Sequence, residues 1–259
     1  MLDITAKVIE NRLLSEKGRI YSLTLDSPEL SKDCLPGQFY EIKVGGLDSR
    51  FLLRRPFSVA FCDDKTVTIR YNVVGAGTEW MSGITPGQML DVLGPLGRGW
   101  PVDKTKKTLL VGGSTGIFSV LGAASHLGDK SRAVLGFRSC DLVNSVEDFK
   151  AFGVPVSIIT EDGSSGRKGL VTELVKEELD KNEYDTVFIC GSTLMMKSVA
   201  ELLKDYDVDC YVSIEERMAC GVGACMGCVV KIKADNEQGW EYKRACAEGP
   251  VFNAAEVIW

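Results

Sequence analysis

Four cysteines near the end of the chain have the residue type and spacing of an iron–sulfur site. Cys220, Cys225 and Cys228 lie within one short segment, and Cys246 follows after a gap. This Cys-x4-Cys-x2-Cys order with a distant fourth cysteine is the plant-type spacing of thiolates that bind a 2Fe–2S cluster. Such a cluster carries one electron at a time, so the segment predicts a protein that passes electrons on.

The residues between these cysteines also suit a loop around an inorganic core. Gly221, Gly223 and Gly227 are small, and glycine tolerates the positive φ angles that such loops need. Structural zinc sites also use four cysteines, but they usually pair two short Cys-x2–4-Cys knuckles. The spacing therefore favours iron–sulfur ligation and leaves two alternatives open, a zinc site and thiols that are free or disulfide-bonded.

Composition and charge narrow the class of protein. The chain has 259 residues, 45% of them apolar and 25% charged, which is ordinary for a soluble globular protein with room for two domains and a small module. A net charge of −6 argues against nucleic-acid binding, which needs a basic face. The start of the chain lacks a basic region followed by an apolar run, so we expect no secretory signal.

Two further features predict a cytoplasmic protein without a membrane segment. The most apolar long stretch, residues 108–124, is interrupted by glycines and is too short to span a bilayer. The chain has nine cysteines, and in a chain without a signal peptide they indicate a reducing compartment.

Periodicity predicts a multi-domain β plus α/β fold. Residues 1–101 contain short alternating strands separated by turns, which is typical of an antiparallel barrel; the expected strands are 6–9, 20–25, 39–44, 57–61, 67–73 and 89–93, with a helix at 78–84. Residues 102–210 alternate apolar strands with helices, which indicates a parallel sheet; the expected strands are 108–111, 133–137, 156–159, 186–189 and, last, 210–213, and the expected helices are 117–127, 170–179 and 195–203.

Residues 211–259 are expected to form a small cysteine module. A hairpin of residues 229–233 and 240–243 would return Cys246 to the cluster loop. A segment of this size makes little core of its own, so we expect a bound cluster to supply much of its folding free energy.

Two glycine motifs in the α/β region predict a nucleotide site. Gly112, Gly113 and Gly116 separate a strand from a helix, where the backbone can approach a pyrophosphate at the helix N-terminus. The full Gly-x-Gly-x-x-Gly pattern is missing, and a tight turn alone also needs glycine. Cys190 and Gly191 follow another strand at the edge where open sheets bind ligands, although a turn with a buried thiol explains them equally well.

Candidate ligand-binding residues also occur in the barrel region. Arg55-Pro56-Phe57-Ser58 offers a planar guanidinium and a hydroxyl to a pyrophosphate, and Gly77-Thr78 can open a helix at a phosphate. Arg70-Tyr71-Asn72 lies between them. Taken singly, Arg55 is as well explained as a surface charge and Tyr71 as a core residue. The order of the motifs, barrel first and nucleotide domain second, is what favours a functional role.

Two other candidates are better explained without a catalytic role. His126 is the only histidine and falls late in a predicted helix, where a cation suits the helix dipole, so no histidine-dependent triad is expected. Glu161 and Asp162 follow a predicted parallel strand, where they could touch a ligand or equally belong to a solvated loop, and we favour the loop.

These motifs together resemble the ferredoxin–NADP reductase superfamily. Its flavin barrel carries Arg-x-x-Ser and a later Gly-Thr, as at 55–58 and 77–78, and its nucleotide domain carries Gly-Gly-x-x-Gly and Cys-Gly, as at 112–116 and 190–191. The segments 215–228 and 242–252 narrow this resemblance to one family within the superfamily. Over its whole length the chain resembles the family of electron-transfer subunits of bacterial NAD-dependent dihydroorotate dehydrogenases.

The resemblance implies an oxidoreductase subunit that holds FAD and a 2Fe–2S cluster and exchanges electrons with NAD. A partner subunit holding FMN would oxidise dihydroorotate to orotate, in pyrimidine biosynthesis, in a heterotetramer of two copies of each chain. No residue of this chain would act as an acid or base, because hydride transfer between nicotinamide and a flavin depends on alignment.

The resemblance also assigns residues to each ligand. FAD would be held by Arg55, Pro56, Phe57, Ser58, Arg70, Tyr71, Asn72, Gly77 and Thr78, and the nicotinamide by Gly112, Gly113, Gly116, Cys190 and Gly191. The chain departs from the family where Ser114 replaces a third glycine and Phe118-Ser119 replaces a proline-bearing stretch, so we expect these side chains to crowd a dinucleotide.

The sequence leaves other functions open. The same fold serves as a small subunit of an NADH–ferredoxin or sulfur-reducing oxidoreductase, or of a paralogous dehydrogenase with another substrate. A flavin and iron–sulfur redox sensor is a non-enzymatic alternative, and it would need an output domain.

Overall fold

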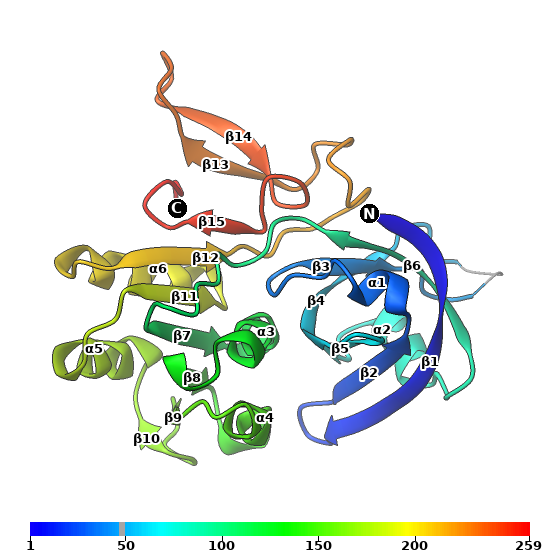
Figure 1. The fold of residues 1–259 in the computed structure, drawn as a ribbon, viewed down its shortest axis with the longest axis horizontal. Helices are drawn as coiled ribbons and strands as arrows, with labels where there is room; N and C mark the ends of the chain where they lie inside the picture. Colours follow the sequence, from blue (N-terminus) through cyan, green and yellow to red (C-terminus); the bar gives the residue numbers. More distant parts are fainter. Residues whose placement is uncertain (47–49) are drawn as a thin grey trace.

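Alternating apolar residues close the N-terminal strands into an antiparallel barrel (Figure 1). The computed structural model describes residues 1–46 and 50–259. The barrel strands are β1 (Leu2–Ser15), β2 (Ile20–Asp26), β3 (Phe39–Ile42), β4 (Arg55–Cys62), β5 (Thr66–Asn72) and β6 (Met89–Leu96), in the order β1-β2-β5-β4-β3-β6. Two short helices, α1 (Pro28–Ser31) and α2 (Ala76–Ser82), accompany them. The predicted barrel is confirmed.

Apolar strands of the α/β region form a seven-stranded sheet beside the barrel. In spatial order they are β10 (Arg167–Lys168), β9 (Val156–Thr160), β8 (Ser131–Phe137), β7 (Thr108–Gly113), β11 (Thr186–Cys190), β12 (Asp209–Ser213) and β15 (Val251–Asn253). All neighbouring pairs are parallel except β12 with β15. The predicted parallel sheet is confirmed.

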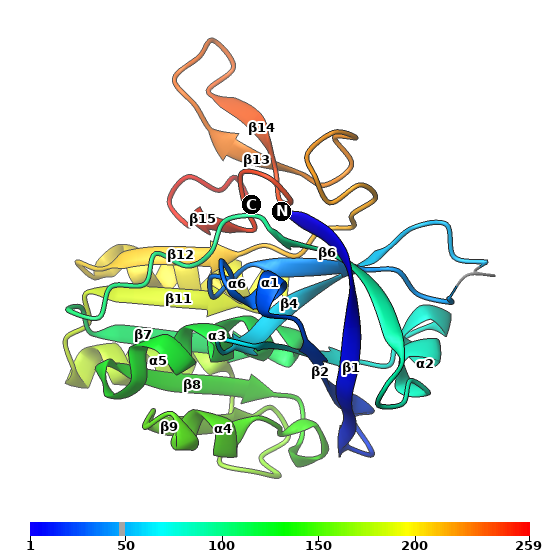
Figure 2. The ribbon, with the colours of Figure 1, turned by 45° about the vertical axis from the view of Figure 1, so that its right-hand side comes forward.

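Helices cover both faces of this sheet (Figures 1 and 2). They are α3 (Ile117–Leu127), α4 (Val146–Ala151), α5 (Val171–Lys181) and α6 (Thr193–Leu202), with 3₁₀ turns at Ser114–Gly116, Gly128–Lys130, Cys140–Leu142 and Leu203–Asp205. Helix α3 is buried along most of its length because it packs between the sheet and β4. A Cβ at Gly122 would lie 3.2 Å from the Val59 carbonyl oxygen, so glycine allows this close contact between helix and barrel. Within residues 1–46 and 50–259, no helix is both long and apolar enough to cross a membrane.

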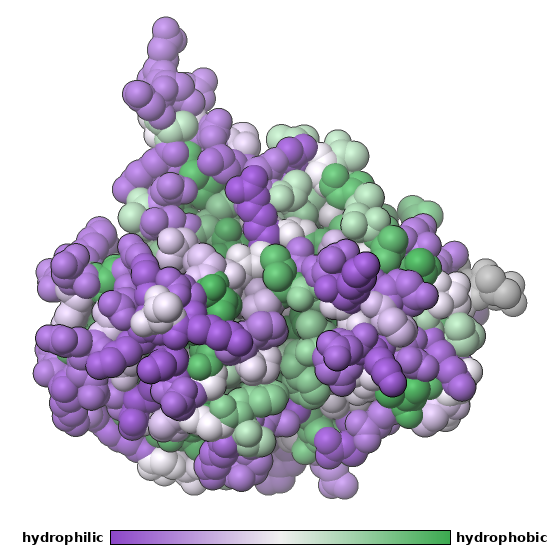
Figure 3. Space-filling view, viewed as in Figure 1, coloured by the Kyte–Doolittle hydropathy of each residue, from purple (hydrophilic) through white to green (hydrophobic). Residues whose placement is uncertain are grey.

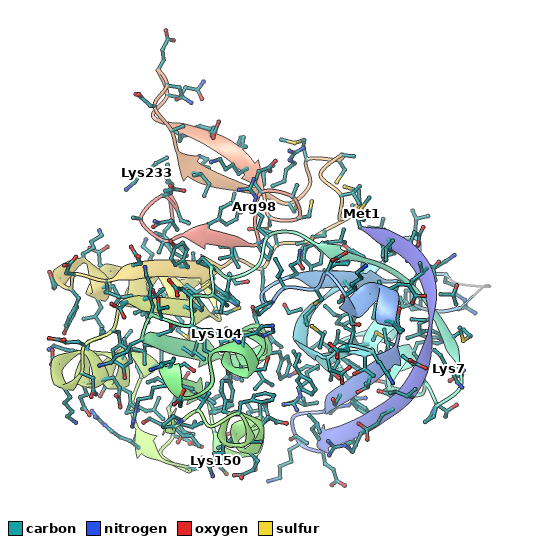
Figure 4. The ribbon with its side chains drawn as sticks, viewed as in Figure 1. Met1, Lys7, Arg98, Lys104, Lys150 and Lys233 are labelled. Carbon is teal, nitrogen blue, oxygen red and sulfur yellow. The ribbon has the colours of Figure 1, made fainter. Side chains whose placement is uncertain are left out.

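The C-terminal segment contacts both the sheet and the barrel. Strands β13 (Val229–Lys233) and β14 (Trp240–Arg244) form the predicted hairpin, which projects from the molecule (Figure 1). The chain then returns as β15 along β12, with Ser213 opposite Val251. At the end of β6 the Arg98 N–H donates to the Gly249 carbonyl oxygen at 2.6 Å, and Figure 4 shows Arg98 between the barrel and this segment.

The expectation that residues 210–213 form the last strand of the sheet was wrong, because β15 pairs outside them. Three residues such as Val251–Asn253 give no periodic signal of their own, and their strand conformation comes from pairing with β12. The predicted boundary between residues 210 and 211 falls inside β12. The boundaries of the three predicted units stay predictions.

Candidate functional site

The two glycine turns of the α/β region meet at the carboxyl edge of the sheet. Gly112 lies opposite Cys190 in the pairing of β7 with β11. A Cβ at Gly116 would lie 2.3 Å from the Cys190 carbonyl carbon, and one at Gly191 would lie 2.5 Å from the Met195 methyl carbon. At Gly116 only glycine lets the two backbones approach so closely, whereas at Gly191 the contact is with a flexible side chain. The structure thus brings the residues predicted for nicotinamide into one place.

A cavity of about 570 Å³ opens beside these turns. Its lining includes Asn72 from the barrel, Gly113 and Ser114 from the turn after β7, and Arg138 and Glu161 from the ends of β8 and β9. The Asn72 Oδ1 atom is buried and has no hydrogen-bond partner among the described residues, so it can accept a hydrogen bond from a ligand. One residue predicted for FAD, Asn72, and one predicted for NAD, Gly113, therefore line the same cavity.

Two charged residues line this cavity, Arg138 and Glu161. Arg138 is not among the residues that the sequence predicts for a site, and for Glu161 a solvated loop is the favoured interpretation and ligand contact the alternative. The signal that could have found them is their position directly after β8 and β9, at the ligand-binding edge. Of the departures from the family pattern, Ser114 lines the cavity with φ +54°, whereas Phe118 is buried outside the lining.

The barrel motif brings a guanidinium next to a helix start. The Arg55 Nη1 donates to the carbonyl oxygens of Leu53 and Arg54 at 2.8 and 3.1 Å. A Cβ at Gly77 would lie 3.5 Å from the Arg55 Nε, so the first turn of α2 contacts this side chain. Thr78 Oγ1 accepts the Val74 N–H at 2.9 Å and holds the turn. A guanidinium beside open backbone suits a phosphate group.

The other barrel residues divide between the core and the contact with the α/β region. The Tyr71 ring stacks on Tyr21 at 5.6 Å between centroids and meets the edge of Phe57 at 5.8 Å, and burial raises the pKa of Tyr71. The Arg70 guanidinium instead forms an ion pair of 2.7 Å with Asp148 of α4. Arg70 therefore joins the barrel to α4, and its assignment to FAD stays a prediction.

The cysteine loop has the backbone that a cluster needs. Gly221, Gly223 and Met226 have φ angles of +67°, +81° and +57°, so the loop curls tightly. The Gly223 N–H donates to the Cys246 Sγ at 3.1 Å, which shows that the hairpin returns this cysteine to the loop. The Cys225 N–H donates to the Cys220 Sγ at 3.4 Å. Backbone donors aimed at sulfur are the kind of contact that tunes iron–sulfur potentials.

The thiols of this loop differ in their ease of ionisation. Burial raises the pKa of Cys220, but hydrogen bonds from the backbone N–H groups of Val222, Cys225 and Ala224 outweigh burial and lower it to about 6. Burial, reinforced by a hydrogen bond with the Cys228 thiol, raises the pKa of Cys246 to about 12. The thiolate is the metal-binding form, so the loop favours it at Cys220.

A charged pair that the sequence did not indicate stabilises the conformation of the loop. The Arg244 guanidinium donates to the Gly223 carbonyl oxygen, and its Nε donates to Glu248 Oε2 at 2.9 Å. The hydrogen bond to Arg244 lowers the pKa of Glu248 to about 2. In the part of the chain that the structure describes, no three metal-binding side chains surround a single ion position. A 2Fe–2S cluster divides its four ligands between two irons.

Known proteins match both the loop and the whole chain. Residues 215–258 match the iron–sulfur cluster binding domain of dihydroorotate dehydrogenase B. The dihydroorotate dehydrogenase B (NAD(+)) electron transfer subunit of Caldanaerobacter subterraneus subsp. tengcongensis is 39% identical over 255 residues, which cover 98% of both chains. The subunit of the same name from Bacillus caldolyticus is 39% identical and covers 97% of this chain and 96% of its own.

Solved structures share the fold. The structure of an NADH-dependent reduced ferredoxin–NADP oxidoreductase, described with flavin-based electron bifurcation, has a TM-score of 0.85 and 28% identity, covering 98% of this chain and 90% of that one. A ferredoxin reductase in carbazole 1,9a-dioxygenase, 20% identical with a TM-score of 0.66, covers 80% of this chain and 66% of its own and shows the fold alone. With the family resemblance of its motifs thereby confirmed, this chain belongs to the family of electron transfer subunits of NAD-dependent dihydroorotate dehydrogenase B.

Proposed function

We propose that this chain relays electrons from a catalytic partner, which oxidises dihydroorotate in pyrimidine biosynthesis, to NAD. The observation that carries the proposal is the 39% identity over 98% of the chain to an electron transfer subunit of that enzyme, together with an intact four-cysteine loop. When bound, FAD exchanges a hydride with nicotinamide and single electrons with an iron–sulfur centre. The chain itself contributes binding, orientation and the electrostatic surroundings.

Each ligand has a proposed set of residues. The four cysteines of the loop and hairpin hold the 2Fe–2S cluster, a role supported by the backbone donors to Cys220 and Cys246. The contact between Arg55 and Gly77 supports their place at the FAD pyrophosphate. The set for FAD is Arg55, Pro56, Phe57, Ser58, Arg70, Tyr71, Asn72, Gly77 and Thr78, and that for NAD is Gly112, Gly113, Gly116, Cys190 and Gly191.

The proposed partner is an FMN-containing catalytic subunit, in a heterotetramer of two copies of each chain in the cytoplasm. Val222 and Met226 of the cluster loop expose apolar surface, and so does Met1. Figures 1 and 2 show the N-terminus beside this loop, and Figure 3 shows apolar residues near the junction of barrel and hairpin. Apolar surface around a redox centre supports docking of another subunit there. We also propose the three units 1–101, 102–210 and 211–259.

The proposal is tested by measuring which reactions this chain catalyses alone and which need the catalytic partner. We expect the purified chain, loaded anaerobically with FAD and a 2Fe–2S cluster, to oxidise NADH with an artificial acceptor. It should oxidise dihydroorotate only when the catalytic partner is added. Dihydroorotate oxidation by this chain alone would contradict the proposal, as would stoichiometric zinc without acid-labile sulfide.

A second candidate is the small subunit of an NADH-dependent ferredoxin–NADP oxidoreductase. The solved structure with a TM-score of 0.85 favours it, although its identity of 28% is lower than the 39% of the dihydroorotate dehydrogenase relatives. An assay with reduced ferredoxin as the electron donor distinguishes the two candidate functions. If the chain and its partner reduce NAD with ferredoxin but not with dihydroorotate, the second candidate is correct.

A further inference from the structure

Glu41 is a charged residue type in a place that water does not reach. Its exposed fraction is 0%, and within residues 1–46 and 50–259 neither carboxyl oxygen has a hydrogen-bond partner. Burying a carboxyl group without a partner costs free energy, so native proteins rarely do it without a functional reason. None of the sites proposed above uses this residue.

The strand direction explains where the side chain points. In β3 the flanking residues Tyr40 and Ile42 belong to the core of the barrel, so Glu41 points outward. There it meets the cluster loop. A Cβ at Gly221 would lie 2.7 Å from Glu41 Cγ and 3.0 Å from its Oε1. Gly221 directly follows the proposed ligand Cys220, so Glu41 contacts the loop next to a ligand.

Across one edge of β3 Glu41 lies opposite Leu93 of β6, and across the other it meets the proposed flavin strand. Glu41 lies opposite Pro56 in the pairing of β3 with β4. The guanidinium groups of Arg54 and Arg55 are near enough to act electrostatically on its carboxyl group. Arg54 already forms an ion pair of 2.7 Å with Asp91. Glu41 thus fills the space between the cluster loop and the strand of the flavin motif.

We propose that Glu41 is a positioning residue that seats the Cys220 end of the cluster loop against the flavin barrel. This inference rests on the proposed function, because it presumes a cluster in the loop and FAD on β4. A polar side chain behind a ligand loop orients the ligands, and the Oε1 of Glu41, which lies beside Gly221 and is unpaired among the described residues, is free to accept a hydrogen bond from that loop. The role explains why an unpaired carboxyl group is retained where an apolar side chain would pack at lower cost.

The variants Glu41→Leu and Glu41→Gln distinguish a positioning role of the Glu41 side chain from a role in which it only fills space. Leucine fills a similar volume without polar atoms, so we expect the protein to fold at least as stably as the wild type. Glutamine keeps the size and the hydrogen-bonding capacity. Glu10→Leu is the control, because Glu10 is an exposed carboxylate on the barrel with one ion pair of 3.6 Å to Arg12.

The experiment uses the full chain loaded with FAD and cluster. After mixing with NADH, we expect Glu41→Leu to reduce its flavin at the wild-type rate but its cluster about 10 to 100 times more slowly, the usual effect of losing a residue that supports metal ligands. We also expect the electron paramagnetic resonance spectrum of its reduced cluster to change. Glu41→Gln and Glu10→Leu should match the wild type in both measurements.

Two results would overturn the inference. One is a Glu41→Leu protein with both cofactors, a wild-type spectrum and a wild-type rate of cluster reduction. The other is a Glu41→Gln protein as impaired as Glu41→Leu, because charge rather than positioning would then be responsible. A wild-type chain that binds no FAD or no cluster would instead contradict the proposed function, before the variants are compared.

Discussion

The ion pair between Arg70 and Asp148 is expected to stabilise the contact between the barrel and α4. The Arg70 Nη2 lies 2.7 Å from Asp148 Oδ1, and its Nη1 lies 2.8 Å from Oδ2, which makes the pair bidentate. The same Nη1 donates to Ser145 Oγ at 2.6 Å. Replacing either charged partner tests how much of the stability depends on this pair.

The burial of its two side chains determines how much free energy this ion pair contributes to stability. Exposed pairs contribute about 0.2–1 kcal/mol, whereas removing one partner of a buried pair costs about 3–5 kcal/mol. The Arg70 side chain is 2% exposed and that of Asp148 is 35% exposed, so this pair falls between the two cases. We therefore expect a coupling free energy of about 2 kcal/mol in a double-mutant cycle of Arg70→Met and Asp148→Asn.

The same exposures predict an asymmetry between the single variants. Asp148→Asn removes the negative charge and one of the two acceptor oxygens from a buried guanidinium, which keeps the Ser145 hydroxyl and the face of Phe61, 5.8 Å away, and this should cost about 3 kcal/mol. Arg70→Met leaves a carboxylate that water still reaches, and should cost about 2 kcal/mol. Urea unfolding followed by circular dichroism and by tryptophan fluorescence measures both. A coupling below about 0.5 kcal/mol, or a greater cost for Arg70→Met, would refute this reasoning.

Three further predictions concern the cluster, the nucleotide edge and Glu41. Cys225→Ser should lose iron and acid-labile sulfide but keep FAD, because the flavin motif lies elsewhere in the chain; loss of both from a folded protein would contradict this. Gly116→Ala should cost about 1–3 kcal/mol by overpacking and weaken NAD binding, because its Cβ would lie 2.3 Å from the Cys190 carbonyl carbon. The control Gly75→Ala, with no described atom within 4 Å of its Cβ, creates no such clash and should cost less than Gly116→Ala in thermal unfolding. Burial raises the pKa of Glu41 from 4.5 to about 7, so its carboxyl group costs the fold least below pH 4.5, where it is protonated in both states, and that cost grows as pH rises through 7. In cluster-free protein, the free energy of unfolding of Glu41→Gln should therefore exceed that of the wild type by about 3 kcal/mol more at about pH 8 than at about pH 4. An equal difference at both pH values would contradict the raised pKa of Glu41.

Local patterns predicted most of the fold. The helix expected at 117–127 is α3, and the strand expected at 229–233 is β13, because hydrophobic periodicity and turn residues lie within each segment. The return of Cys246 to the cluster loop also followed from a local feature, the hairpin. Strand β15 was missed because its three residues depend on a partner more than thirty positions away, at Ser213 opposite Val251.

The candidate site was predictable where a motif is contiguous and unpredictable where a contact joins distant segments. The family resemblance assigns Arg70 to FAD, but its guanidinium bonds with Asp148, 78 residues further along the chain. For Glu161 the sequence leaves ligand contact and a solvated loop both open and favours the loop. Its place in the cavity depends on how β9 lies beside β8, which the sequence of either strand does not encode.

The attachment of the C-terminal segment explains how a loop with little core of its own can hold a cluster at a fixed place. Strand β15 fixes its end to the sheet, the Arg98 amide fixes Gly249 to the last barrel strand, and Glu41 contacts the loop beside Cys220. Cys228 and Cys246 lie in the same apolar core as β7 and β12. Because these supports come from both the barrel and the sheet, a shift of either against the other would move the cluster. The ion pair of Arg70 with Asp148 resists that shift, so we expect its loss to alter electron transfer as well as stability.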